Sequence, residues 1–427
     1  MTEHQLFLFL AETAALVAAA RIGGEIALRL GIAQVVGELV MGIALGPSLF
    51  GALWPGGFHA LFPTDPGQRN LLEIMGWIGV IFLALLSGME TRLGMVRRAG
   101  RAVAYGWMGG FLLPFAAGFG LAFLTPGRLL PRGIDQAVFA LFVGTAMSIS
   151  AIPVIARILM DMGLMRTRIG TVIISSAVAD DTVGWIVLAV VTGLVLRRRF
   201  DLSSVAVAVL GTAAFLIVAF TLGQWLVARA LAWSERMRAP HAFTAMKLVI
   251  VFLGGAATQA IHVHLVLGVF VAGILIYRSP TRNRAAAEEI RAVAMALFVP
   301  FFFAYTGIKV DLTTITGSAL AFAAAAVAVA CGGKLIGGSL GARAGGLPMW
   351  GALAVGAGLN ARGAMELVIA TIGLSIGVLT LPVYSILVLI AVLTTLMAAP
   401  LLRVCVARVP DAGADVARKG TAAEIPV

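Results

Sequence analysis

Residues 144–191 read GTAMSISAIPVIARILMDMGLMRTRIGTVIISSAVADDTVGWIVLAVV, and this stretch decides the fold. It joins two apolar runs, about 136–158 and 168–195, through a short basic turn. Each run is long enough to cross a bilayer core of about 30 Å as a helix. The second run carries Asp180 and Asp181 near its middle, where charge is costly. The stretch therefore predicts membrane-spanning helices that hold buried ionisable groups.

The rest of the chain has the same character. Of its 427 residues, 60% are hydrophobic and 12% are charged, against roughly 25% charged in soluble domains. Solid apolar runs of this length predict helices, whereas the strands of a barrel would alternate. We expect an all-α polytopic membrane protein with about thirteen spans. The predicted spans are 5–22, 32–49, 71–89, 102–124, 136–158, 168–195, 203–227, 244–261, 263–277, 295–308, 317–341, 350–374 and 380–404.

The formal charge of +11 reflects arginines in short loops, which is typical of cytoplasmic membrane anchors and not of nucleic-acid binding. The basic loops include residues 92–101, 157–168, 229–238 and 278–291, while the cluster 197–199 breaks the pattern. This asymmetry predicts an inner-membrane protein with its N-terminus outside and a short cytoplasmic tail at 405–427.

No sequence pattern supports an enzyme or a bound cofactor. The two cysteines, Cys331 and Cys405, lie far apart in or beside apolar segments, so we expect neither a disulfide nor a metal site. There is no nucleotide-binding glycine loop and no nucleophile–base pair.

Asp180 and Asp181 are candidates for ion binding. Adjacent helical residues point about 100° apart, so one carboxylate can face a cavity while the other meets a neighbouring helix. Two close carboxylates repel, which helps one of them to hold a proton and later exchange it for a cation. The alternative is a pair of buried acids that only packs helices together.

Lys334, in the run ACGGKLIGG, is a third charge within an apolar segment. It can pair with one of the two aspartates, and the neighbouring glycines would then let helices approach closely. The alternative is that its side chain snorkels to the membrane surface.

Two apolar segments are interrupted by polar residues, proline or glycine. One carries Thr145, Ser148, Ser150 and Pro153, and the other carries Gly356, Gly358, Asn360, Arg362, Gly363 and Glu366. Each lies beside a segment with an intramembrane charge. Paired interrupted segments of this kind indicate an inverted-repeat transporter with a site near the midplane. The alternative for each segment is an ordinary loop or a packing kink.

The quoted stretch resembles the monovalent cation/proton antiporter superfamily, in the branch of Kef-type and Nap-type exchangers, which tends to read GxAxSxTAxPVxARIL and then AxxDDxxxW. AQVVGELVMGIALGPS (33–48), GGKLIGG (332–338) and LNARGAMELVIATIGLSIGVL (359–379) also resemble this branch. The resemblance covers almost all of residues 5–404. Ser150 replaces the usual threonine, and we expect no large nucleotide-binding domain after the membrane region.

The resemblance implies a dimerisation domain beside a core domain with two crossing broken helices, in a homodimer. We expect core elements at about 71–195 and 295–404, and scaffold elements at about 5–49 and 203–277. It also implies residue roles. Asp181 matches the principal cation and proton carboxylate, and Asp180 matches the partner of Lys334. Thr145, Ser148 and Ser150 are expected to add oxygen ligands.

The sequence and this resemblance together predict antiport of protons against Na⁺ or K⁺ by alternating access, and the set of two aspartates and a lysine resembles that of the electrogenic exchangers. No cofactor is expected, and the partners are the transported ions and the lipid bilayer. Two alternatives remain open. One is a sodium-coupled organic-anion carrier of the same architecture, and the other is a non-exchanging cation channel or sensor.

Overall fold

The computed structural model describes residues 2–91, 100–165, 167–197, 202–261, 263–280 and 284–409, which form helices and no strands. The α-helices are α1 Glu3–Arg29, α2 Gln34–Leu45, α3 Phe50–Leu53, α4 Pro55–Leu61, α5 Pro66–Glu90, α7 Arg101–Phe123, α8 Gln136–Ser148, α9 Ile152–Asp161, α10 Arg168–Arg197, α11 Leu202–Val218, α12 Gln224–Ser234, α13 Ala242–Ala260, α14 Leu265–Arg278, α15 Arg284–Val293, α16 Val299–Ile308, α17 Ser318–Ala344, α18 Met349–Leu359, α19 Ala364–Ser375 and α20 Leu381–Val406. Short 3-10 turns occur at Gly127–Leu129 and Leu312–Thr314, and π-helical turns occur at Ala219–Gly223 and Ala294–Phe298.

The predicted all-α membrane fold is confirmed. Among the described residues, eleven helices are long and apolar enough to cross a bilayer, and the bent pair α18–α19 raises the number to twelve. The predicted span at 263–277 corresponds to α14, which has only 14 residues. At 1.5 Å per residue α14 extends about 21 Å, which is short for a bilayer core of about 30 Å. The number thirteen therefore stays a prediction.

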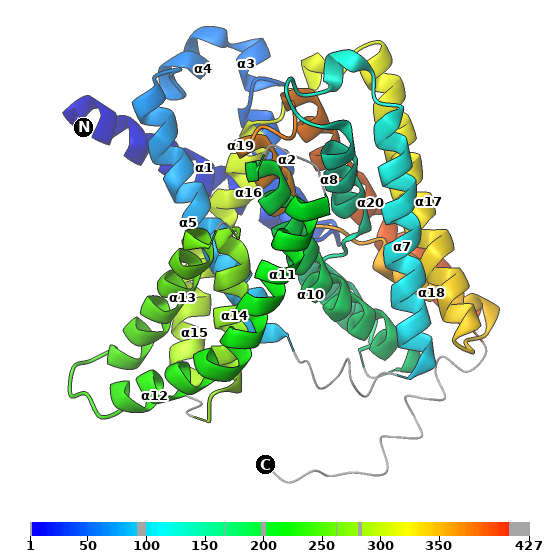
Figure 1. The fold of residues 1–427 in the computed structure, drawn as a ribbon. Coiled ribbons are helices and arrows are strands. Elements are labelled where there is room, and N and C mark those ends of the chain that lie inside the picture. Colours follow the sequence, from blue (N-terminus) through cyan, green and yellow to red (C-terminus); the bar gives the residue numbers. More distant parts are fainter. Residues whose placement is uncertain are drawn as a thin grey trace.

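Two groups of helices repeat the same order in opposite directions (Figure 1). The first is α7, the broken pair α8–α9 and α10, and the second is α17, the broken pair α18–α19 and α20. The α18–α19 pair bends by 43° at a break of four residues. Because α8 and α18 enter from opposite ends of the molecule, their breaks meet midway (Figure 1). This is the inverted arrangement that the interrupted segments predict.

Small residues let α7 and α17 pack backbone to backbone. A Cβ added to Gly337 would lie 2.2 Å from the Gly109 carbonyl oxygen, and one added to Gly333 would lie 2.8 Å from Pro114. Glycine is required at such contacts because any side chain would force the helices apart. Gly332 points into open space instead. This close contact places Lys334, between the two packed glycines, inside the molecule and not at its surface.

A second group contains α1, α2, α5, α13, α14 and α16. A Cβ on Gly88 of α5 would lie 2.1 Å from the Phe270 carbonyl oxygen of α14, and one on Gly42 of α2 would lie 2.3 Å from the Ala304 carbonyl oxygen of α16. Thus α5 and α16 pack with this group, although the ranges 71–195 and 295–404 were expected to belong to the core.

Part of the charge pattern cannot be compared with the structure. Residues 92–99, Arg166, 198–201, 281–283 and 410–427 lie outside the described residues, and they include much of the basic loop sequence and most of the expected tail.

Candidate functional site at the helix crossover

The two broken helices cross at their breaks, residues 149–151 and 360–363. The Ala151 amide donates a hydrogen bond to the Ala361 carbonyl at 3.0 Å, which joins the two breaks directly. Pro153 lies in the first turn of α9, where a helix does not need the missing N–H. The break between α8 and α9 therefore comes before Pro153, at residues 149–151, and it includes Ser150.

Arg362 neutralises one end of the crossover. Its side chain is fully buried, and it donates to the carbonyls of Ala146 and Met147 in the last turn of α8. It also pairs with Glu366, one turn later in α19, at 3.2 Å. A helix C-terminus carries partial negative charge and an N-terminus partial positive charge. Arg362 thus faces the end that attracts a cation, while Glu366 lies in the first turn of α19, the end that attracts an anion.

Asp180 is held by one strong partner and one hydroxyl. Its Oδ2 lies 2.7 Å from Nζ of Lys334, and Ser150 donates to the same oxygen at 2.6 Å. Both charged side chains are buried, with exposed fractions of 0% for Lys334 and 1% for Asp180. The structure thus brings Lys334 to Asp180, and the observed position is not that of a snorkelling side chain. Ser150 also lies 2.8 Å from the Leu359 carbonyl, so it links α10 to the end of α18.

Asp181, one residue further along α10, points to a different environment. Its Oδ2 accepts a hydrogen bond from Ser87 of α5, and it lines a cavity of about 280 Å³. A water molecule occupies about 30 Å³ of liquid, so the cavity has room for several waters or a partly hydrated ion. The two neighbouring acids therefore have separate surroundings. Asp180 is paired with the buried ammonium group of Lys334, and Asp181 faces the cavity.

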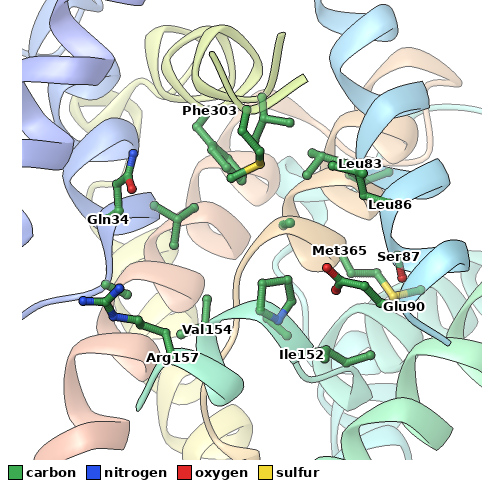
Figure 2. A pocket seen from close by; sticks show the side chains of 18 of the residues that line it. Gln34, Leu83, Leu86, Ser87, Glu90, Ile152, Val154, Arg157, Phe303 and Met365 are labelled. Atoms are coloured by element: carbon green, nitrogen blue, oxygen red, sulfur yellow. The ribbon is translucent and has the colours of Figure 1, made fainter. Parts of the chain in front are cut away.

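The cavity runs from Asp181 toward the end of the molecule where α1 and α5 finish and α2 begins. Figure 2 shows Gln34 and Arg157 on one side of it and Ser87 and Glu90 on the other. Exposure falls inward: the side chain of Arg157 is 58% exposed, whereas Asp181 is 4% exposed.

Two of the other charged groups that line the cavity are already engaged. Glu90 pairs with Arg291 at 2.6 Å. Glu38 is buried and accepts a hydrogen bond from Gln34 at 2.7 Å. The lining residues come from α2, α5 and α16 of one helix group and from α9, α10 and α19 of the other, so the cavity lies between the two groups.

Other predicted site residues lie near the crossover without facing the cavity. The hydroxyls of Thr145 and Ser148 donate to the carbonyls of Leu141 and Thr145 within their own helix. Asn360 is fully buried at the end of α18. In this conformation, therefore, Ser150 is the only one of the three predicted hydroxyls that contacts a candidate carboxylate.

Sequence reasoning missed Ser87. It lies on α5, and its neighbours in LALLSGME give no pattern that singles it out. Within the described parts of the chain, no group of three or more His, Cys, Asp or Glu residues could hold a metal ion.

The profile described as "Sodium/hydrogen exchanger, transmembrane" matches residues 14–406, which is most of the chain. The chain belongs to the sodium/hydrogen exchanger family. Among curated relatives, the chain is 30% identical to the Na(+)/H(+) antiporter NhaS4 of Synechocystis over 94% of this chain and 98% of that protein. It is 28% identical to the Na(+)/H(+)-K(+) antiporter GerN of Bacillus cereus, over 93% of this chain and 96% of that protein.

Other relatives of this chain are longer. Cation/H(+) antiporter 18 of Arabidopsis thaliana is 32% identical, and the match covers 86% of this chain but 45% of that protein. The chain therefore spans about half the length of several curated relatives that it matches. Among solved structures, the sodium proton antiporter MjNhaP1 of Methanocaldococcus jannaschii has a TM-score of 0.63 at 15% identity, over 94% of this chain and 97% of that one. That likeness shows a shared fold.

Proposed function

We propose that this exchanger carries out antiport of protons against a monovalent cation, with Asp181 as the group that binds either ion. The observation that carries the proposal is the separation of the two acids. Asp180 is neutralised by Lys334, whereas Asp181 faces a cavity beside two broken helices. A single carboxylate at the cavity that binds either a proton or a cation couples the two fluxes, because one ion must leave before the other can bind.

The pair of Asp180 and Lys334 supports electrogenic exchange. Burial of both groups means that Lys334 favours proton loss in a conformation in which the pair separates and Asp180 stays ionised beside a bound cation. A second proton can then accompany the first during the cycle. Arg362 donates to a carbonyl in the last turn of α8, and its positive charge offsets the partial negative charge of that helix end. This compensation is present even when the site holds only a proton.

We propose domain boundaries that follow the packing. The moving core consists of α7 to α10 and α17 to α20, and the scaffold consists of α1, α2, α5 and α11 to α16. The cavity lies between these groups, so a movement of one against the other would carry Asp181 from one face of the membrane to the other. The scaffold would also form the homodimer. We place the protein in the inner membrane with its N-terminus outside, so that this cavity opens to the cytoplasm.

The cation is a hard ion with oxygen ligands, and Na⁺ and K⁺ both satisfy that chemistry. The names of relatives point to both ions: NhaS4 is named a Na(+)/H(+) antiporter, and a 28% identical protein of Saccharomyces cerevisiae is named a K(+)/H(+) antiporter. We therefore propose a transporter for one or both ions. We assign it no enzymatic activity and no resident cofactor.

The proposal is tested with purified protein in liposomes that carry a pH gradient. Addition of Na⁺, K⁺, Li⁺ or Rb⁺ in turn should dissipate the gradient for the transported ions. Asp181→Asn should abolish the response while the protein still inserts, because the amide cannot hold a proton in exchange for a cation. Glu25→Gln, which removes an exposed carboxylate at the end of α1, is the matched control and should leave exchange intact.

Normal exchange by Asp181→Asn would overturn the assignment. Cation flux without coupled proton movement would favour a channel. Movement of an organic anion with sodium, without proton exchange, would favour the carrier of the same architecture.

A further inference from the structure

Asp181 is hydrogen-bonded to a side chain from the opposite wall of the cavity. Ser87 belongs to α5, and Asp181 belongs to α10. The two helices pack mainly into different groups, since α5 lies against α14 and α16, whereas α10 lies against α7, α8 and α18 and meets the scaffold at α11 and α14. The bond therefore connects the two groups at the candidate ion-binding carboxylate.

The backbone of α5 is fixed to its own group at this level. A Cβ on Gly88, the next residue, would lie 2.1 Å from the Phe270 carbonyl oxygen of α14. A Cβ on Gly273 of α14 would lie 2.6 Å from the Leu85 carbonyl oxygen. Contacts this close leave little room for sliding. Ser87 must therefore remain with α14 when α10 moves.

The hydroxyl of Ser87 suits both occupants of the site. A serine hydroxyl donates one hydrogen bond and also accepts. It donates to the Asp181 carboxylate in this structure. When a cation sits at Asp181, the hydroxyl proton can turn to the carbonyl four residues earlier in its own helix, as helical serines often do. The freed lone pair then faces the cation, and hard cations favour such oxygen ligands.

We propose that Ser87 is a side-specific ligand of the transported cation, contributed by the scaffold and available only while the cavity is open on this side. The inference rests on the proposed function. It makes the site asymmetric: Asp181 has the Ser87 oxygen beside it when it faces this cavity, and it loses that oxygen when α10 carries it to the opposite face. The cation is then held more weakly at the second face, which favours its release there.

The test measures exchange from each face separately, in everted and right-side-out membrane vesicles, with Na⁺ and K⁺ as the probes. Ser87→Ala should raise the apparent KM for the cation on the cavity side about three- to tenfold, the range expected for one lost neutral polar contact. The KM on the opposite side and the maximal rate should not change. Ser87→Thr keeps the hydroxyl and should restore the KM.

Thr182→Val is the matched control. It removes a hydroxyl next to Asp181 in sequence, but that hydroxyl donates to the Val178 carbonyl of its own helix at 2.9 Å. An unchanged KM in Ser87→Ala on both sides, or an equal rise on both sides, would overturn the inference. Both outcomes require that the wild-type protein exchanges ions in the same vesicles. A wild type without exchange would overturn the proposed function itself, so the two failures are distinguishable.

Discussion

At the residue scale, the crossover holds four charged side chains that are shielded from solvent. Asp180, Lys334, Arg362 and Glu366 are each at most 1% exposed. Removing an ion from water costs several kcal/mol even after relaxation, so these groups are tolerated only as pairs. The sequence predicted the two acids and the lysine because charge within an apolar run is conspicuous. It could not predict Ser87, because a serine in a membrane helix is common and its partner lies 94 residues away.

Breaking the buried pair should destabilise the protein. Lys334→Met leaves the Asp180 charge without its partner, and loss of one member of a buried pair costs about 3–5 kcal/mol. We expect a clear fall in thermal stability in detergent. The double variant Asp180→Asn with Lys334→Met removes both charges and should recover most of that loss. Equal stability of wild type and Lys334→Met would show that the pair contributes nothing to the folded state.

At the element scale, the sequence located both broken helices, and the predicted residues Ser150, Asn360 and Arg362 lie at the breaks, but the sequence did not fix where each helix ends. Pro153 was an obvious interruption, yet the chain leaves helical geometry before it, at residues 149–151, and Pro153 starts the next helix. Thr145 and Ser148 were expected to face the ion. In this conformation their hydroxyls donate to the carbonyls of Leu141 and Thr145, which leaves the hydroxyl lone pairs available, so their role as cation ligands stays a prediction.

The contact between α7 and α17 gives a prediction at this scale. Gly337→Ala would place a methyl group 2.2 Å from the Gly109 carbonyl oxygen, so the helices must separate. Such overpacking typically costs about 1–3 kcal/mol. Gly332→Ala, in the same helix, meets nothing within 4 Å and should be neutral or slightly stabilising. Thermal unfolding of the two variants checks this, and equal effects would contradict the packing described for Gly337.

At the scale of the whole molecule, the two groups of helices are open to each other at one end and joined at the other. Opposite the cavity mouth, the Tyr384 hydroxyl of α20 donates to the Thr306 carbonyl of α16 at 2.8 Å. Nearby, the Asp311 amide donates to Ser385 at 3.1 Å. The inverted order of the two sets of core helices was predictable from the two interrupted apolar segments. The grouping of α5 and α16 was not, because it depends on which glycine faces meet, and a single sequence does not reveal that.

The contacts opposite the mouth should set the balance between the two open states. Tyr384→Phe removes one bond between the groups, so it should favour opening at the far end. A Leu83→Cys probe in the cavity, with Cys331 and Cys405 replaced by alanine, would report this through a membrane-impermeant maleimide added on the cavity side. The labelling rate should fall in Tyr384→Phe. Thr394→Val removes an α20 hydroxyl bonded within its own helix and should leave the rate unchanged.

The most direct test of the account is the pH dependence of the apparent KM for the cation on the cavity side. If a proton and a cation compete for Asp181, the KM should rise as the pH on that side falls, and the maximal rate at saturating cation should stay constant. A KM that is independent of pH, with a maximal rate that falls on acidification, would contradict a single shared site.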